Sequence, residues 1–322
     1  MYFDRRVAPD LHRALLPTGF ASSLVEFSRS GQYALDLQFR RNPKDRRSWV
    51  TLYVGTTKVL DLAFTEKSGR FKVSADKAWA NPKFGWDPAW STSRAEHLLA
   101  ADWPAVDAYL EMVIPLVPER YLKEGRVQAG ISHFAADDLV IIDRETVIGF
   151  TDATERSDVT SRLRRPLMAA VTCPGPAWWK PKVPGNECDA LAISRTGEVL
   201  AIEVKPAGVD IAWAPLQAHH YADLLQKWVN ETPDAREVLT GMFEQRADLG
   251  LTTCTWDVTL PASIVVRPVV AVRRGASPTY VARMRRVVEQ IRAAELDTPA
   301  MQFRRVNLVG RLDPWDLDSE VN

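Results

Sequence analysis

Residues 187–205 constrain the fold most, because they read as two apolar strands joined by a tight turn yet carry charges where a buried strand should have none. Asp189 lies near the start of the first strand, and Glu203 and Lys205 lie at the end of the second. The loop between them is 195–197, and a three-residue hairpin loop often ends on glycine, which accepts positive φ at no steric cost. The pattern predicts three charged side chains on neighbouring strands.

The turn also sets the register of the two strands. If Ser194 pairs with Glu198, then Asp189 lies directly opposite Glu203, with their Cβ atoms roughly 4.5–5.5 Å apart. Side chains alternate between faces along a strand, so Glu203 and Lys205 point the same way, and their face is the candidate active face. The opposite face is expected to pack as core, and it carries Ala190, Ala192, Ile202 and Val204.

Two facing carboxylates beside a lysine suit a divalent metal. Mg²⁺ prefers oxygen ligands and is usually held by one or two carboxylates plus substrate phosphate. We expect Asp189 and Glu203, with the Val204 carbonyl as a third oxygen, to bind Mg²⁺ or Mn²⁺ and activate a water, which Lys205 would orient. Glu-x-Lys on a strand is usually a solvated edge, but the opposing Asp189 favours a metal site, because facing like charges destabilise a sheet.

The segment after these strands is predicted to be a helix that begins near Pro215, a residue suited to a first helical position. One stripe of this helix is polar at its start and apolar at its end, and comprises Gln217, Tyr221, Leu224, Leu225 and Trp228. Gln217 and Tyr221 should therefore face the sheet near the end of the strand that carries Lys205. The alternative is a core glutamine and tyrosine whose polar atoms find backbone partners.

Three elements follow one another along the chain: Asp189, then Glu203-Val204-Lys205, then Gln217-x-x-x-Tyr221. Together they resemble the PD-(D/E)XK nuclease superfamily and its RecB-like branch. The resemblance implies that Asp189 and Glu203 are metal ligands, that Lys205 is the catalytic lysine, and that Gln217 and Tyr221 line the site and contact nucleic acid. It also implies that a further strand and helix continue the core, and 263–272 and 279–296 fit them. The family often adds another acid, for which Glu119, Glu155 and Glu187 are the candidates.

The N-terminal part has a different pattern. Alternating apolar residues from Tyr33 to Phe39 predict a half-buried strand, and 49–54, 58–64 and 70–74 predict further strands. Later segments predict a capping box and helix start (Ser93 and Glu96), a second helix start (102–104) and a hairpin (139–143 with 147–150). We therefore expect an α+β protein, with a small N-terminal antiparallel β domain in 1–92 and a PD-(D/E)XK-like core, a mixed sheet flanked by helices, in 93–322.

The remaining sequence limits the function. The chain has only three cysteines, widely spaced, and no phosphate-binding loop, so we expect neither an iron–sulfur cluster nor an ATP motor. It has no apolar run of membrane-spanning length and no signal segment, so we expect a cytoplasmic protein that does not bind membranes. The favoured function is metal-dependent hydrolysis of nucleic acid, DNA rather than RNA. Alternatives are a silent nuclease-fold module that binds nucleic acid or protein, and a nuclease subunit of a larger defence or repair complex. Besides nucleic acid, the expected partner is another protein or a second copy of the chain.

Overall fold

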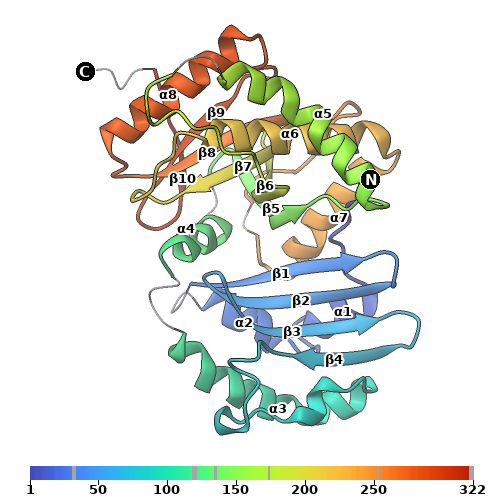
Figure 1. Ribbon diagram of the computed structural model, residues 1–322. Coiled ribbons are helices and arrows are strands. Elements are labelled where there is room, and N and C mark those ends of the chain that lie inside the picture. The colour runs from blue at the N-terminus through green and yellow to red at the C-terminus, as the bar shows by residue number, and fades with distance from the viewer. Residues whose placement is uncertain (31–33, 118–121, 134–135, 173–174, 253, 319–322) are drawn as a thin grey trace. The chain divides into compact units, whose positions relative to one another are not determined.

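The computed structural model describes residues 1–322 except 31–33, 118–121, 134–135, 173–174, 253 and 319–322 (Figure 1). The chain forms two compact units. One unit contains 4–133 and 241–253, and the other contains 1–3, 134–240 and 254–322. The predicted domain boundary falls after residue 92, whereas the compact units divide after residue 133, because the helices that follow 92 belong with the N-terminal sheet.

The first unit is built on an antiparallel sheet in the order β1-β2-β3-β4. Its strands are β1 (Leu35–Asn42), β2 (Arg47–Val54), β3 (Thr57–Thr65) and β4 (Arg70–Ser74). They confirm the predicted strands, and residue 33 lies outside the described ranges. The other elements of this unit are α1 (Pro9–Leu15), α2 (Ser23–Arg29), η1 (Pro82–Phe84), η2 (Pro88–Ser91), α3 (Glu96–Val113), η3 (Ile114–Leu116) and α4 (Leu122–His133).

The helix α3 corrects two predictions. Ser93 does not cap it, because the next residue, Arg94, forms a β-bridge with Phe71, in which the two exchange backbone hydrogen bonds of 2.8 and 2.9 Å. Ala95 is the N-cap residue instead. No second helix starts at 102–104, since α3 runs through Pro104. Pro104 is exposed, so the carbonyl that loses its helical partner there can bond to water.

The second unit is built on a six-stranded mixed sheet in the order β10-β9-β8-β7-β6-β5. β7 is parallel to β8, and β8 to β9, while the remaining pairs are antiparallel. The strands are β5 (Leu139–Val147), β6 (Glu187–Ser194), β7 (Val199–Lys205), β8 (Val266–Arg273), β9 (Gln302–Val306) and β10 (Leu312–Pro314). The architecture is thus α+β, an antiparallel four-stranded sheet followed by a mixed sheet with helices, as the sequence predicts.

Helices cover the sheet of the second unit in the region that carries β7 and β8 (Figure 1). They are α5 (Ala153–Val171), α6 (Ala214–Glu231) and α8 (Pro278–Ala293), and α7 (Ala235–Asp248) leads the chain from this unit into the other. Apolar residues of β8 and β9 pack against α6 and α8, and Val270, Met284 and Phe303 belong to that cluster. None of the helices in the described ranges is both long and apolar enough to cross a membrane.

The predicted hairpin over 139–150 is wrong, because β5 is one strand that pairs with β6 along its length, with a register shift between Ile141 and Asp143. Arg144, which falls in the predicted turn, is buried and only 2 % exposed, as is Asp143 at the end of the first predicted strand. Thr146 donates its hydroxyl to Asp143 Oδ2 at 2.8 Å, which satisfies part of that buried carboxylate. Buried polar groups with partners can continue a strand that sequence patterns interrupt.

Asp297 fixes α6 to the segment that follows α8. His219 Nε2 donates to Asp297 Oδ1 at 3.1 Å, Arg292 Nε donates to Oδ2 at 3.1 Å, and the Met301 N–H donates to Oδ1 at 2.8 Å. Burial alone would raise the pKa of Asp297, but these hydrogen bonds outweigh it and lower the pKa to about 2. The helix that carries Gln217 and Tyr221 is therefore held by a charged carboxylate.

Replacement Asp297→Asn should destabilise the protein by about 1–2 kcal/mol at neutral pH, after allowance for partial exposure. The folded pKa is below the unfolded value of 3.8. The stabilisation is therefore fully present above about pH 4 and is lost as the pH falls towards 2. Denaturant unfolding across this range would measure it. A difference between wild type and variant that stays constant down to pH 2 would contradict the assignment.

Candidate functional site

The hairpin of β6 and β7 has the register that the sequence predicts. Ala190 pairs with Ile202, the Ser194 N–H donates to the Glu198 carbonyl at 2.8 Å, and Gly197 has a φ of +82° in the turn. The next position along this register brings Asp189 opposite Glu203. The residues expected on the other face, Ala190, Ala192, Ile202 and Val204, are all fully buried.

Glu203 is a buried carboxylate with incomplete pairing. The residue is 1 % exposed, and its Oε1 forms an ion pair with Lys205 Nζ. Its Oε2 is buried and receives no hydrogen bond from the described residues. Burial and the neighbouring Asp189 raise the pKa of Glu203 well above its ordinary value, and Lys205 opposes them. Because an orphaned buried carboxylate oxygen destabilises a fold, this oxygen is a candidate ligand for a cation.

Asp189 lies beside this carboxylate and is only partly buried. Its Oδ2 accepts the Val204 N–H at 2.8 Å, so the backbone of β7 holds its side chain against Glu203. The two acids and Lys205 thus come together as predicted from the sequence. Their donor set, two carboxylates that face each other, fits the oxygen preference of Mg²⁺ or Mn²⁺. The Val204 carbonyl as a third ligand stays a prediction.

Among the described residues, no third acidic ligand joins this pair. Across the part of the chain that the structure describes, no three His, Cys, Asp or Glu side chains are grouped so as to hold a metal ion. Glu187 is exposed. Glu155 accepts hydrogen bonds from the Met1 amino group at 2.8 Å and from the Thr151 N–H at 2.6 Å. Glu119 lies outside the described residues.

Gln217 and Tyr221 lie near the start of α6, and Glu203 is close enough to affect the pKa of Tyr221. Tyr221 is 4 % exposed, and Gln217 is partly buried. Burial and then Glu203 raise the pKa of Tyr221, while a side-chain hydrogen bond with Gln217 opposes the rise. A Cβ built on Gly185 would lie 3.6 Å from the Tyr221 hydroxyl. The hydroxyl is therefore close to the chain just before β6.

Tyr221→Phe should lower substrate binding or cleavage about tenfold, with less than about 1 kcal/mol change in stability, if the hydroxyl serves the substrate. Gln217→Ala should have the same signature, because the glutamine interacts with that hydroxyl. Melting curves and specific activity would be measured on the same preparations. A lower melting temperature with normal activity per folded molecule would make both residues purely structural.

The structure adds three residues that the sequence analysis did not assign to the site. Arg164 on α5 donates from Nε to His220 Nε2 at 3.2 Å and from Nη2 to the Gly185 carbonyl at 3.1 Å. Nη2 also donates to Asn186 Oδ1. A signal for Arg164 was present, since it falls on the same helical stripe as Thr160 and Leu167, which are buried. A charged residue in a buried stripe needs hydrogen-bond partners, which predicts contacts of this kind.

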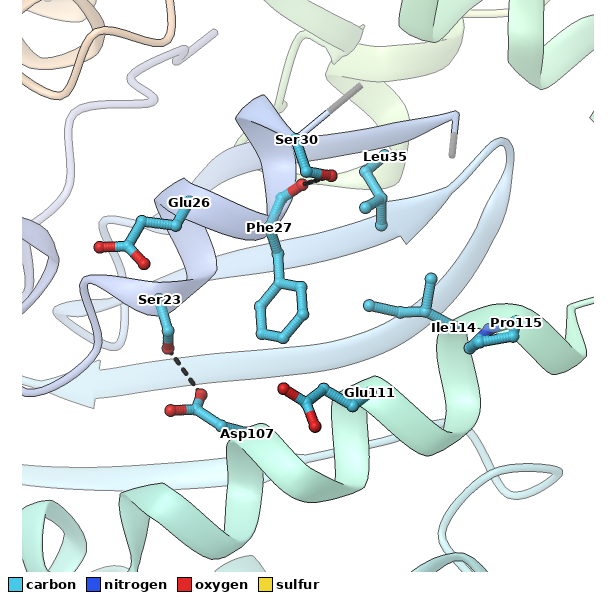
Figure 2. Close-up of a pocket in the computed structure, with 9 residues that line it drawn as sticks. All are labelled: Ser23, Glu26, Phe27, Ser30, Leu35, Asp107, Glu111, Ile114 and Pro115. Carbon is cyan, nitrogen blue, oxygen red and sulfur yellow. Dashed lines mark hydrogen bonds between the residues drawn. The ribbon is translucent and has the colours of Figure 1, made fainter. Parts of the chain in front are cut away.

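The unit with the four-stranded sheet contains a separate pocket of about 460 Å³ (Figure 2). Its acids are Glu26, Asp107 and Glu111, and Ser23 donates to Asp107 at 2.6 Å. Burial raises the pKa of Asp107, and both glutamates add to the rise. Such a pocket disfavours phosphate, so we do not assign it to the same chemistry. Its other lining residues are Phe27, Ser30, Leu35, Ile114 and Pro115.

Comparison of the chain with protein-family models, with curated proteins and with solved structures gives no match. The site is therefore interpreted from its own geometry.

Proposed function

We propose that the chain is a divalent-metal-dependent nuclease of the PD-(D/E)XK type that hydrolyses DNA phosphodiester bonds. The observation that carries the proposal is the buried Glu203 beside Asp189: its Oε2 receives no hydrogen bond from the described residues, while Lys205 pairs with its Oε1. A purely structural pair would leave this oxygen without compensation, and well-packed apolar residues would be at least as stable in its place.

Each residue has a definite role in this proposal. Asp189 and Glu203 would hold Mg²⁺ or Mn²⁺, with the Val204 N–H fixing the Asp189 carboxylate through Oδ2. When bound, the ion would lower the pKa of a coordinated water and neutralise charge on the phosphate. Lys205, whose side chain is 18 % exposed, reaches solvent from its contact with Glu203. Its ammonium would orient the attacking water and stabilise negative charge that develops on the phosphate.

The surroundings of the carboxylates support a polyanionic substrate. Tyr221 and Gln217 supply polar groups from α6 beside Glu203. Arg164 adds a cation near the same tyrosine, since burial lowers the pKa of Arg164 and Tyr221 opposes that shift. A phosphodiester strand needs both a cationic centre and hydrogen-bond donors along its backbone. The proposal therefore assigns nucleic acid as the substrate, in preference to a small uncharged molecule.

An assay on purified protein tests this function. Single- and double-stranded substrates, each circular and linear, and a matched RNA would be incubated with Mg²⁺ or Mn²⁺. The proposal predicts cleavage of DNA that excess EDTA stops and that added metal restores. Failure to cleave any of these substrates under either metal, or cleavage that persists in excess EDTA, would contradict it.

A further inference from the structure

Arg164 is held in one orientation by groups that are not acids. Its Nε and Nη2 are used by His220, Gly185 and Asn186. Its Nη1 has no partner in the described ranges of the chain, and the side chain is only partly buried. Within those ranges no carboxylate forms an ion pair with it, since each of its contacts goes to a neutral acceptor. The guanidinium thus stays positively charged, and the edge that carries Nη1 is available to a ligand.

His220, which accepts a hydrogen bond from Arg164, leaves one of its own ring nitrogens without a partner among the described residues, and this costs stability. Arginine can only donate, so in the 3.2 Å contact His220 accepts at Nε2 and carries its proton on Nδ1, and the longer 3.5 Å approach of Nε2 to Asn186 Oδ1 is then not a hydrogen bond. That Nδ1 is buried with no acceptor among the described residues, and the imidazole is fully buried. Burial and the charge of Arg164 lower the pKa of His220 to about 3, so the ring stays a neutral acceptor. A protein that only needed a packed core would place an apolar side chain here.

The position of Arg164 relates it to the carboxylate site. Gly185 accepts from Arg164 Nη2 at 3.1 Å, and the Tyr221 hydroxyl lies close to the same glycine. Tyr221 in turn interacts with Glu203. Asn186, which also accepts from Arg164, lies three residues before Asp189. The guanidinium and the two acids therefore flank Tyr221 at one end of β6.

We propose that Arg164 forms an oxyanion subsite, in which its free guanidinium edge binds a non-bridging oxygen of a backbone phosphate of the substrate strand next to the one that is cleaved. The inference rests on the proposed function and extends it to strand positioning. Arg164 is the binding residue, and His220 and Asn186 are positioning residues. Arginine suits this task because its planar fork remains charged and matches phosphate oxygens.

The test is fluorescence anisotropy of labelled DNA with the full chain in Ca²⁺ at several salt concentrations. Arg164→Ala should weaken binding about tenfold and lower the slope of log affinity against log salt by about one phosphate contact. Asn186→Ala keeps the charge but removes an acceptor, so it should weaken binding less. Arg165→Ala, an exposed neighbour on α5, is the matched control and should stay close to wild type.

Each outcome decides the inference. Equal losses in Arg164→Ala and Arg165→Ala would mean a diffuse basic surface and would overturn the subsite. So would a lower melting temperature with unchanged DNA affinity. Stabilisation of the wild type by inorganic phosphate, lost in Arg164→Ala while DNA affinity stays normal, would overturn the assignment to a strand. If the wild type binds DNA through Arg164 but cleaves nothing, the subsite stands and the nuclease proposal fails.

Discussion

Replacing Glu203 with glutamine is expected to abolish cleavage and, in the absence of metal, to raise the melting temperature. The carboxylate is buried, its Oε2 has no hydrogen bond from the described residues, and it faces Asp189. Glutamine has the same shape, cannot ionise and can donate an amide hydrogen to Asp189. We expect a gain of about 1 kcal/mol or more, which corresponds to roughly 2–4 °C per kcal/mol.

The matched control is Glu198→Gln, on the turn that leads into β7. Glu198 forms an ion pair with Arg267, whose Nε lies 3.1 Å from Glu198 Oε1. Its replacement should leave cleavage intact and should not raise the melting temperature. Calorimetric melts with and without Mn²⁺ would show metal stabilisation in wild type and in Glu198→Gln alone. An active Glu203→Gln with a lowered melting temperature would make Glu203 a structural residue.

Lys205→Ala is expected to reduce turnover about 10²–10³-fold, a loss typical of removing one group that stabilises transition-state charge. Metal affinity should persist or rise, because the ammonium that neutralises Glu203 Oε1 is gone. Without metal the variant should melt at a lower temperature, since the buried Glu203 loses its partner, and Mn²⁺ should restore much of the difference. Single-turnover cleavage and calorimetric titration with Mn²⁺ measure the two effects separately.

The metal affinity of Lys205→Ala should be compared with that of Glu203→Gln. If Lys205→Ala lost metal affinity as fully as Glu203→Gln, the lysine would organise the site instead of acting on the substrate. Lys227, which is partly buried and pairs with Glu231 one turn along α6, offers a control in which a similar ion pair is broken away from the site. Lys227→Ala should leave both turnover and metal affinity unchanged.

The core of the candidate site could be predicted because its determinants are local. A glycine with positive φ and the two-residue alternation of a strand fix the register of β6 and β7, and that register brings Asp189 to Glu203. The polar start of an apolar stripe likewise indicated Gln217 and Tyr221. The N-terminal strands followed from the same alternation.

The rest depends on contacts between distant residues. Arg144 is buried within β5, so a segment that resembled a turn continues as a strand. Arg164 and His220 are 56 residues apart, and nothing in either segment shows that a neutral histidine receives the arginine. Asn186 lies just before the start of β6. Such pairings form only when α5, α6 and the start of β6 pack together.

The most direct test of the metal site compares the wild type, Glu203→Gln and Glu198→Gln on one DNA substrate, with Mn²⁺ titrated from zero and then removed with EDTA. The account predicts cleavage by the wild type and by Glu198→Gln that rises with Mn²⁺ and stops in EDTA, and none by Glu203→Gln at any concentration. Cleavage by Glu203→Gln at the wild-type rate, or cleavage by the wild type that does not depend on Mn²⁺, would contradict it.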